Sequence, residues 1–459
     1  MLEEDGAAIG PIMKDRFSDL ATNDPSTMDH SGASGRAAIL EPGSRRLEMA
    51  YAIFAILVYL GVQFGLNDGD GSGELAVDAM ATINQAIVLL VGGCFVLRHH
   101  RACLAALPVI WPFLLFLALA AMSSLWSQAP LASLRRSLTL ATLMMFAVYA
   151  HAVLGTLLLC RLQVAAMWIV AFASFAVAAI VPASGFDIGG YAGAVRGVFT
   201  QKNSLGDSMV VGTVALSGIV LCRHRVTLAD LVSLALALAT IILAQATTSL
   251  LLCMAIVVVT TGILLVLDGR ALAVFGLLTG LIAASLAVWI VYVVPVDLFD
   301  LLGKDSSLTG RAEVWTAVRR AIEDGSVLGY GYSAFWLPET PAAQNVWAAL
   351  GWTTPSAHSG YLEVRLELGL PGLLLVAILG IASLAVAVRA WWAGDGATAA
   401  WALIVLMIIA VVNYDESSMP RPDIHLLQWI LAFAACTTGD KPQSSEGQRP
   451  NITLATSEY

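Results

Sequence analysis

The chain has 459 residues, of which 58% are hydrophobic and only 12% are charged. Soluble domains carry about 25% charged residues, so this composition excludes a water-soluble globule, which would lack the charge to cover its surface. It predicts an all-α, polytopic membrane protein. The formal net charge of −9 does not indicate how the protein is oriented in the membrane, because the charge of each short loop decides the orientation.

Both ends of the chain are polar. Residues 1–48 are rich in Gly, Ser and Asp and lack the apolar core of a cleavable signal peptide. We expect them to form a disordered cytosolic tail, and residues 438–459 to form a second cytosolic tail. Met49 stands at the start of the first apolar run and is an alternative translation start.

Between the tails, the chain is a series of apolar stretches, and a spanning helix needs about 20 mostly apolar residues. The pattern predicts about twelve membrane-spanning helices, nine within residues 49–296 and three within residues 370–437. The expected spans are roughly 49–66, 75–97, 105–125, 137–154, 163–182, 204–222, 227–246, 249–267, 271–296, 371–389, 397–413 and 422–437.

Basic residues of the short loops orient these spans, because Lys and Arg are enriched on the cytoplasmic side. If the spans alternate, most short-loop arginines fall on one side, which is then the cytoplasm. Both termini are cytoplasmic in this arrangement, and residues 297–369 form a large extracytoplasmic loop. The arginines that set the orientation are Arg45, Arg46, Arg98, Arg101, Arg161, Arg223, Arg225, Arg270 and Arg389.

Arg196 and Lys202 lie on the opposite side, in a short loop of about residues 183–203. Basic residues on the outer side are not unusual in a long loop, because long loops cross the membrane regardless of charge. The loop of Arg196 and Lys202 is short, so this explanation suits it less well. The loop is rich in glycine, which permits close backbone approach, and Asn203 or Ser204 is expected to cap the next helix. Two cations before a helix N-terminus favour an anion site. Contact with lipid headgroups is the alternative.

In the large loop, Thr309 is expected to cap a helix that runs from Arg311 to about Glu323. Arg311 would then lie in the first turn, where a cation opposes the helix dipole. An anion bound there would meet both Arg311 and the dipole, so the unfavourable position indicates a function. A solvated surface arginine is the alternative.

Two further segments of the loop are rich in aromatic residues. Residues 328–336 (LGYGYSAFW) predict a Gly/aromatic turn, and residues 341–352 predict a short helix that lies at the membrane interface, because Trp and Tyr favour the headgroup level. Sugar stacking is an alternative role for these aromatic side chains.

His358 is the candidate proton acceptor of the loop, because histidine titrates near neutral pH. Glu363 follows five residues later, near enough to orient the imidazole or to share its proton. Gly369 and Pro371 are expected to separate a short helix here from the tenth span. A structural histidine is the alternative.

Four motifs in this order resemble the O-antigen ligase/polymerase family (Wzy/WaaL-like), in its exopolysaccharide-production, ExoQ-like branch. The layout of apolar spans is also similar, so the resemblance covers roughly residues 49–437. Ser359 departs from the pattern, which has Asn beside the histidine, and this puts one local hydrogen bond in doubt. The motifs are Arg196-Gly197-Val198-Phe199 with Lys202-Asn203, Leu308-Thr309-Gly310-Arg311 continued to Trp315, Leu328 to Trp336, and Ala357-His358-Ser359-Gly360-Tyr361-Leu362-Glu363.

The resemblance implies a GT-C-like helix bundle that acts on glycans carried by undecaprenyl diphosphate. By this resemblance, Arg196 and Arg311 hold the diphosphate leaving group, with Lys202 as a further phosphate contact. His358 takes the proton of the attacking sugar hydroxyl, and Glu363 supports it or is itself the base. No cofactor or metal is expected, because arginines neutralise the diphosphate and the outer loops show no acidic cluster.

The expected function is therefore polymerisation of lipid-linked repeat units at the periplasmic face of the bacterial inner membrane. Expected partners are the undecaprenyl-diphosphate-linked glycan, membrane lipid, a chain-length regulator and a flippase, with no nucleic acid. The nearest alternative is an O-antigen ligase, which transfers the glycan to lipid A core or another acceptor. A transporter or flippase is a more distant alternative, because proteins of that class are expected to have ionisable residues in mid-span and an inverted repeat. A sensor that binds lipid without turnover is a third class.

Overall fold

The computed structural model describes residues 42–62, 73–187, 193–267 and 307–439. The chain divides after Arg45 into two units. Of the first unit, the structure describes only the first turn of one helix. The second unit begins at Arg46 and contains the other described residues.

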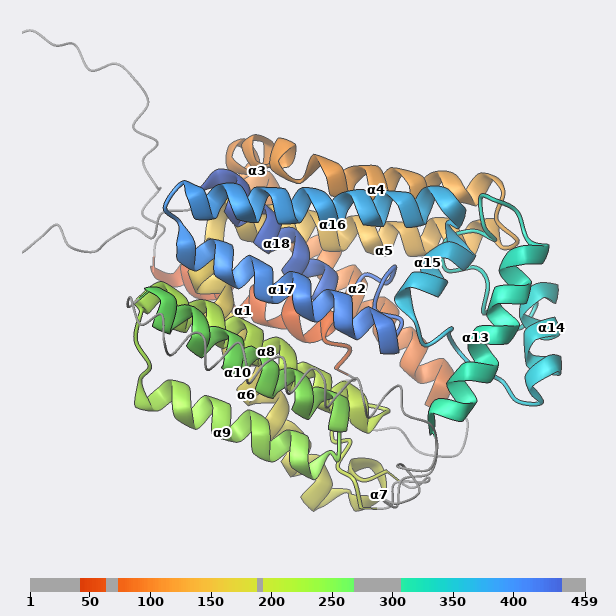
Figure 1. Ribbon diagram of the computed structural model, residues 1–459, viewed down its shortest axis with the longest axis horizontal. Coiled ribbons are helices and arrows are strands. Elements are labelled where there is room, and N and C mark those ends of the chain that lie inside the picture. Colours follow the sequence, from red (N-terminus) through yellow and green to blue (C-terminus); the bar gives the residue numbers. More distant parts are fainter. Residues whose placement is uncertain (1–41, 63–72, 188–192, 268–306, 440–459) are drawn as a thin grey trace, which may run out of the picture. The chain divides into compact units, whose positions relative to one another are not determined.

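The described residues are helical almost throughout (Figure 1). They contain no strand, only an isolated antiparallel bridge between Phe186 and Val195, so the predicted all-α fold is confirmed. Two short 3-10 turns, Leu107–Ile110 and Ser123–Leu125, and a π turn, Ala150–Leu154, extend neighbouring helices. The α-helices are α1 (Pro42–Tyr59), α2 (Gly73–Arg98), α3 (His100–Ala106), α4 (Trp111–Met122), α5 (Pro130–Tyr149), α6 (Thr156–Ile180), α7 (Pro182–Gly185), α8 (Lys202–Arg223), α9 (Leu228–Leu243), α10 (Thr247–Leu267), α13 (Ser307–Asp324), α14 (Pro341–Leu350), α15 (Gly360–Glu367), α16 (Gly369–Trp392), α17 (Gly396–Asp415) and α18 (Ile424–Thr438).

Within the described ranges, 8 helical segments are long and apolar enough to cross a membrane. Two shorter apolar helices, α9 and α18, accompany them. The chain is therefore an all-α polytopic membrane protein. The total of twelve spans stays a prediction, and the expected span 271–296 lies outside the described residues.

Several of the expected spans begin earlier in the structure than predicted, and two of these begin at a proline. The expected first span, 49–66, is α1, which starts at Pro42 and ends before Gly61. The expected fourth span, 137–154, belongs to α5, which starts at Pro130. Proline fits the first turn of a helix because its missing N–H has no intrahelical partner there, and Gly61 has a positive φ of 76° that no right-handed helix continues through.

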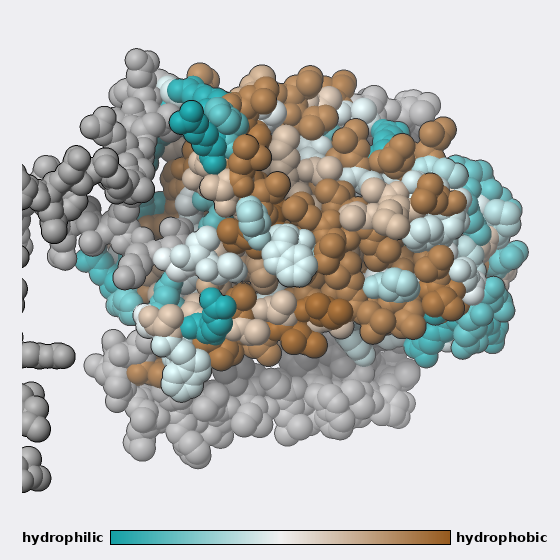
Figure 2. Space-filling view, turned by 90° about the horizontal axis from the view of Figure 1, so that it is seen from above, coloured by the Kyte–Doolittle hydropathy of each residue, from teal (hydrophilic) through white to brown (hydrophobic). Residues whose placement is uncertain are grey.

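The surface of the helices carries an apolar band. Figure 2 shows hydrophobic residues across the middle of one face, with hydrophilic residues gathered at the end where α13 and α14 lie. A surface of this kind suits lipid around the helices and water at the ends. Exposed apolar side chains include Leu90, Leu115, Phe172, Leu374, Ile378 and Ile381.

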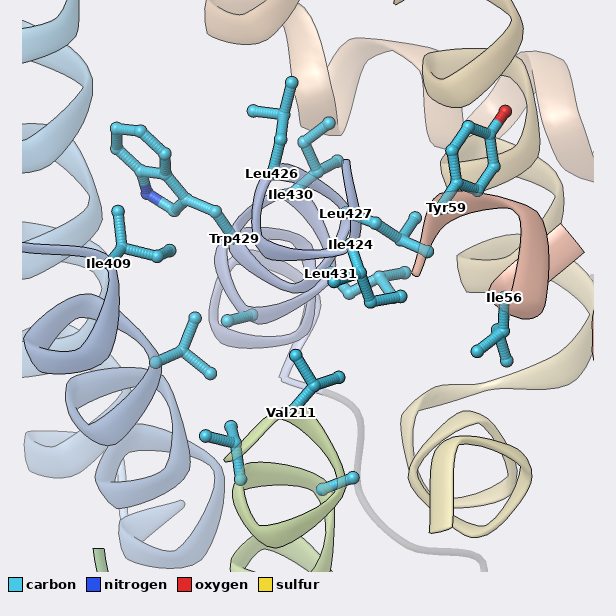
Figure 3. Close-up of a cluster of buried hydrophobic side chains, with 14 of the residues drawn as sticks. Ile56, Tyr59, Val211, Ile409, Ile424, Leu426, Leu427, Trp429, Ile430 and Leu431 are labelled. Atoms are coloured by element: carbon cyan, nitrogen blue, oxygen red, sulfur yellow. The ribbon is translucent and has the colours of Figure 1, made fainter. Parts of the chain in front are cut away.

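Helix α18 lies at the centre of the packing, with every residue from Ile424 to Cys436 buried (Figure 3). Its polar groups are paired inside the bundle. The indole N–H of Trp429 donates to Ser383 Oγ of α16 at 2.8 Å, and Gln428 Nε2 donates to Gln163 Oε1 of α6 at 2.9 Å. Since water does not reach such positions, these bonds fix α18 and with it the turn that precedes it.

Connections expected on the extracytoplasmic side meet at one end of the helices. The α4–α5 connection is bonded to the Gly/aromatic turn, because Trp126 Nε1 donates to the carbonyl of Leu328 at 3.1 Å and the Gln128 N–H to that of Tyr330 at 3.1 Å. The N–H of Gly360, which begins α15, donates to the carbonyl of Glu416 after α17 at 3.0 Å. These connections therefore lie at the same end of the helices.

Gly369 separates α15 from α16, as expected. It has a φ of 67°, and the N–H of the next residue, Leu370, donates to the carbonyl of Val327 at 2.8 Å. A Cβ on Gly369 would collide with that same carbonyl oxygen. The close approach lets residues 327–331 lie against the junction of α15 and α16.

We predict that Gly369→Ala lowers the free energy of unfolding by at least about 1–2 kcal/mol, the cost of a left-handed backbone for a residue with a Cβ, with the collision added. Gly380→Ala, on the same helix, is the matched control, because a Cβ at Gly380 meets nothing within 4 Å. Thermal unfolding of both variants in detergent measures the difference. Equal midpoints would contradict the close approach at Gly369.

Candidate functional site

Helix α13 carries Arg311 but begins at Ser307. Thr309 is therefore inside the helix, and its predicted role as the N-cap is wrong. Several neighbouring Ser and Thr residues suit a helix start equally well, so their order in the sequence does not select one. Arg311 is the fifth residue of the helix, beyond the first turn in which the dipole acts most strongly. The helix dipole therefore gives no reason to expect an anion at this position.

One face of α13 is turned towards the ends of α15 and α17. Arg311 and Trp315 are four residues apart and share this face. Trp315 Nε1 donates to the carbonyl of Ala357 at 3.1 Å, and its ring lies 5.8 Å from that of Tyr414. Arg311 Nη2 reaches Glu416 Oε1 at 3.4 Å. The helix thus brings the guanidinium group of Arg311 to Glu416 and the indole of Trp315 to the residue that precedes His358.

His358 has a φ of 48°, in the left-handed region that residues with a Cβ seldom adopt. Its N–H donates weakly to Ser356 Oγ at 3.4 Å, and its Nδ1 lies 3.7 Å from Glu416 Oε2. The side chain is 27% exposed. A strained backbone with a partly exposed side chain differs from a fully packed structural histidine and favours a functional role.

Glu416 is the residue that the sequence analysis missed. Its two carboxylate oxygens face Arg311 and His358, which lie on α13 and just before α15. The side chains of Arg311 and Glu416 are 23% and 42% exposed, so the cluster is accessible to a ligand. The feature of the sequence that could have identified Glu416 is the polar stretch from Asn413 to Ser418, which separates two apolar spans.

Glu363 is buried and holds the turn that carries His358. Its Oε1 accepts from Trp336 Nε1 at 2.6 Å, and its Oε2 accepts from the Ala357 N–H at 2.7 Å and from Ser417 Oγ at 3.3 Å. Burial raises the pKa of Glu363, against the lowering effect of the Arg421 charge and of these donors. The contacts favour a supporting role for Glu363 over that of a base.

Glu367 lies one turn further along α15 and accepts from the Ser333 N–H at 2.8 Å. Burial, together with the nearby charge of Glu363, raises the pKa of Glu367 to about 8. The Gly/aromatic segment 328–336 therefore packs on the two carboxyl groups of α15, and the N–H of Trp336 is occupied by Glu363.

Arg196 is bound to the backbone of its own connection. Its Nε, Nη2 and Nη1 donate to the carbonyls of Ser184, Ala183 and Thr200 at 2.8, 3.3 and 3.4 Å. A guanidinium group has five N–H donors. The described contacts use three of them and order the loop between α7 and α8.

Lys202 is the first residue of α8, and Gln201 is the N-cap, without a side-chain capping bond. The prediction that Asn203 or Ser204 caps this helix is therefore wrong; the extended backbone of Gln201 ends the loop before either residue is reached. Lys202 Nζ donates to the carbonyl of Gln245 at 3.0 Å, in the α9–α10 connection.

The structure thus joins Arg311 and His358 through Glu416. Glu363 binds the backbone N–H of the residue before His358 and has no described contact with the imidazole. The described contacts of Arg196 stay within residues 183–200. The two regions belong to the same end of the helices, because Asp207 of α8 pairs with His425 of α18 at 2.9 Å. In the part of the chain that the structure describes, no group of three or more His, Cys, Asp or Glu side chains is arranged to hold a metal ion.

Comparison with known proteins gives two matches. Residues 232–377 match the O-Antigen ligase family (Wzy_C), a segment that includes Arg311, His358 and Glu363. The chain is also 32% identical over 97 residues to the "Exopolysaccharide production protein ExoQ" of Rhizobium meliloti (strain 1021). That match spans 20% of this chain and 22% of the relative. Together the matches confirm the resemblance to the O-antigen ligase family and its ExoQ-like branch that the sequence motifs indicated.

Proposed function

We propose that the protein is a membrane glycosyltransferase that polymerises undecaprenyl-diphosphate-linked repeat units into exopolysaccharide. The observation that carries this proposal is the partly exposed cluster of Arg311, Glu416 and His358. It combines a guanidinium group suited to a diphosphate with an imidazole suited to a hydroxyl proton. The matched O-antigen ligase segment contains both of these residues.

The reaction transfers a glycosyl group in one displacement. The acceptor hydroxyl gives its proton to the His358 imidazole, and its oxygen forms a bond to the anomeric carbon of the donor. The bond from that carbon to the diphosphate oxygen breaks, and its electron pair leaves with undecaprenyl diphosphate. Arg311 stabilises the negative charge that grows on the leaving group.

Other residues serve the same step in this proposal. Glu363 holds the backbone before His358 through the Ala357 N–H. Arg196 and Lys202 are proposed as further phosphate contacts, although their described bonds go to backbone carbonyls. Two N–H donors of Arg196 remain for a phosphate oxygen, since its described bonds use three of five.

An O-antigen ligase is the second candidate, because the matching family is described by that activity. The chemistry at the donor is the same, and only the acceptor differs. The exopolysaccharide production protein among the matches favours the polymerase. In either case we place the cluster on the periplasmic side of the inner membrane with both termini cytoplasmic, from the distribution of short-loop arginines.

Arg311→Ala is predicted to reduce polymer formation by at least about 100-fold, the loss typical of removing a donor to a developing charge. Arg311→Lys restores part of the activity, because lysine supplies the charge without the bidentate fork. The measurement is the amount of polymer in a deletion strain that expresses each variant. Arg319→Ala is the control, an exposed arginine on the same helix, and wild-type output from Arg311→Ala would refute the diphosphate role.

The polymerase and ligase candidates differ in what a deletion strain accumulates. We expect gel profiles of cell-surface and secreted glycan to show single repeat units, because a polymerase joins units before any transfer to an acceptor. Long chains that remain unattached would instead identify a ligase.

The orientation predicts which cysteine variants an impermeant thiol reagent labels. In a background without the six native cysteines, Arg320→Cys on α13 should react in intact spheroplasts. Arg225→Cys, exposed in the α8–α9 connection, should react only after permeabilisation. The reverse pattern would invert the topology.

A further inference from the structure

We infer that Glu416 is a positioning residue that passes from Arg311 to His358 when the donor diphosphate binds, so that the base is completed only in the presence of the donor. This inference rests on the proposed function. It assigns a role to a carboxylate that lies outside the matched segment 232–377.

The distances show a carboxylate shared between two partners. Glu416 Oε1 is 3.4 Å from Arg311 Nη2, and Oε2 is 3.7 Å from His358 Nδ1. An N–H···O hydrogen bond normally measures about 2.7–3.2 Å. Both distances are longer than this range. A small rotation of the Glu416 side chain would shorten one of them and lengthen the other.

Only the side chain of Glu416 is free to move. Its carbonyl accepts from the Gly360 N–H at 3.0 Å, and the next residue, Ser417, accepts from the Ser359 N–H at 3.1 Å and donates to Glu363 at 3.3 Å. The backbone is thereby tied to the turn that carries His358. The side chain is 42% exposed and has room to rotate.

A diphosphate displaces the carboxylate for electrostatic reasons. It carries more negative charge than Glu416 and matches the guanidinium fork of Arg311 in two parallel bonds. Its charge also repels Glu416, which is then driven towards the imidazole. A carboxylate at Nδ1 holds the tautomer whose Nε2 lone pair faces outward, and it stabilises the imidazolium formed by proton transfer.

Other charged groups near the cluster are engaged elsewhere. Glu363 is bound by Trp336, Ala357 and Ser417, and Arg421 Nη2 donates to the carbonyl of Pro355 at 3.4 Å. Among the described side chains, Glu416 is thus the one carboxylate in ion-pair reach of both functional residues.

The test uses the full-length protein in lipid nanodiscs and two measurements. Binding of inorganic pyrophosphate is measured by calorimetry, and turnover is measured with lipid-linked repeat units extracted from the deletion strain. Glu416→Gln should bind pyrophosphate about two- to fivefold more tightly, because a partly exposed competing ion pair is lost. Its kcat should fall at least about tenfold, because the imidazole loses its support, while KM does not rise.

Double variants separate this role from a structural one. In the His358→Ala background, Glu416→Gln should still tighten pyrophosphate binding but cause no further loss of turnover. In the Arg311→Ala background, it should no longer tighten binding. Glu416→Asp retains the charge on a shorter side chain and should fall between wild type and Glu416→Gln in kcat.

Glu313→Gln is the matched control, the same chemical change at an exposed position of α13, and should behave as wild type. Weaker pyrophosphate binding by Glu416→Gln, or a kcat equal to that of Glu313→Gln, would overturn the inference even if Arg311→Ala is inactive. Full turnover and unchanged pyrophosphate binding by Arg311→Ala would instead overturn the proposed function itself.

Discussion

The turn between α17 and α18 is the constraint on which the candidate site depends. At Glu416 and Ser417 it exchanges hydrogen bonds with Ser359, Gly360 and Glu363. The turn is itself held because α18 is buried on all sides and bonded to its neighbours through polar side chains. The loop residues are thus positioned by the membrane bundle, and a site built on such rigid elements keeps its geometry.

Environment gives the carboxyl groups of this region different properties. Glu363 and Glu367 are buried one turn apart, where burial raises the pKa of both and the charge of Glu363 raises that of Glu367 further. They accept backbone N–H groups and shape the turn. Glu416 is open to solvent beside Arg311 and His358, a setting that suits a group that changes partners. The exposure of each carboxyl group thus determines whether it is suited to holding the backbone or to contact with a ligand.

The helices were predictable because each apolar run is a local signal. Arg311 and His358 could be proposed as site residues because they stand out in a polar loop, and their roles stay predictions. Helix starts were less predictable, as α13 and α8 show, because neighbouring residues suit a cap almost equally. Glu416 was not identified because its partnership with Arg311 joins positions 105 residues apart. The bond between Glu363 and Ala357 likewise depends on how α15 folds back on its own N-terminal turn, which periodicity does not encode.

The separation between Arg311 and Glu416 also bears on biogenesis. A polytopic chain enters the membrane from its N-terminal end, so α13 is delivered well before the α17–α18 hairpin. Until that hairpin inserts, the turn with His358 lacks the backbone carbonyl that anchors Gly360 and the hydroxyl that anchors Ser359. The turn that carries His358 therefore reaches its final arrangement only when the last pair of helices is in place.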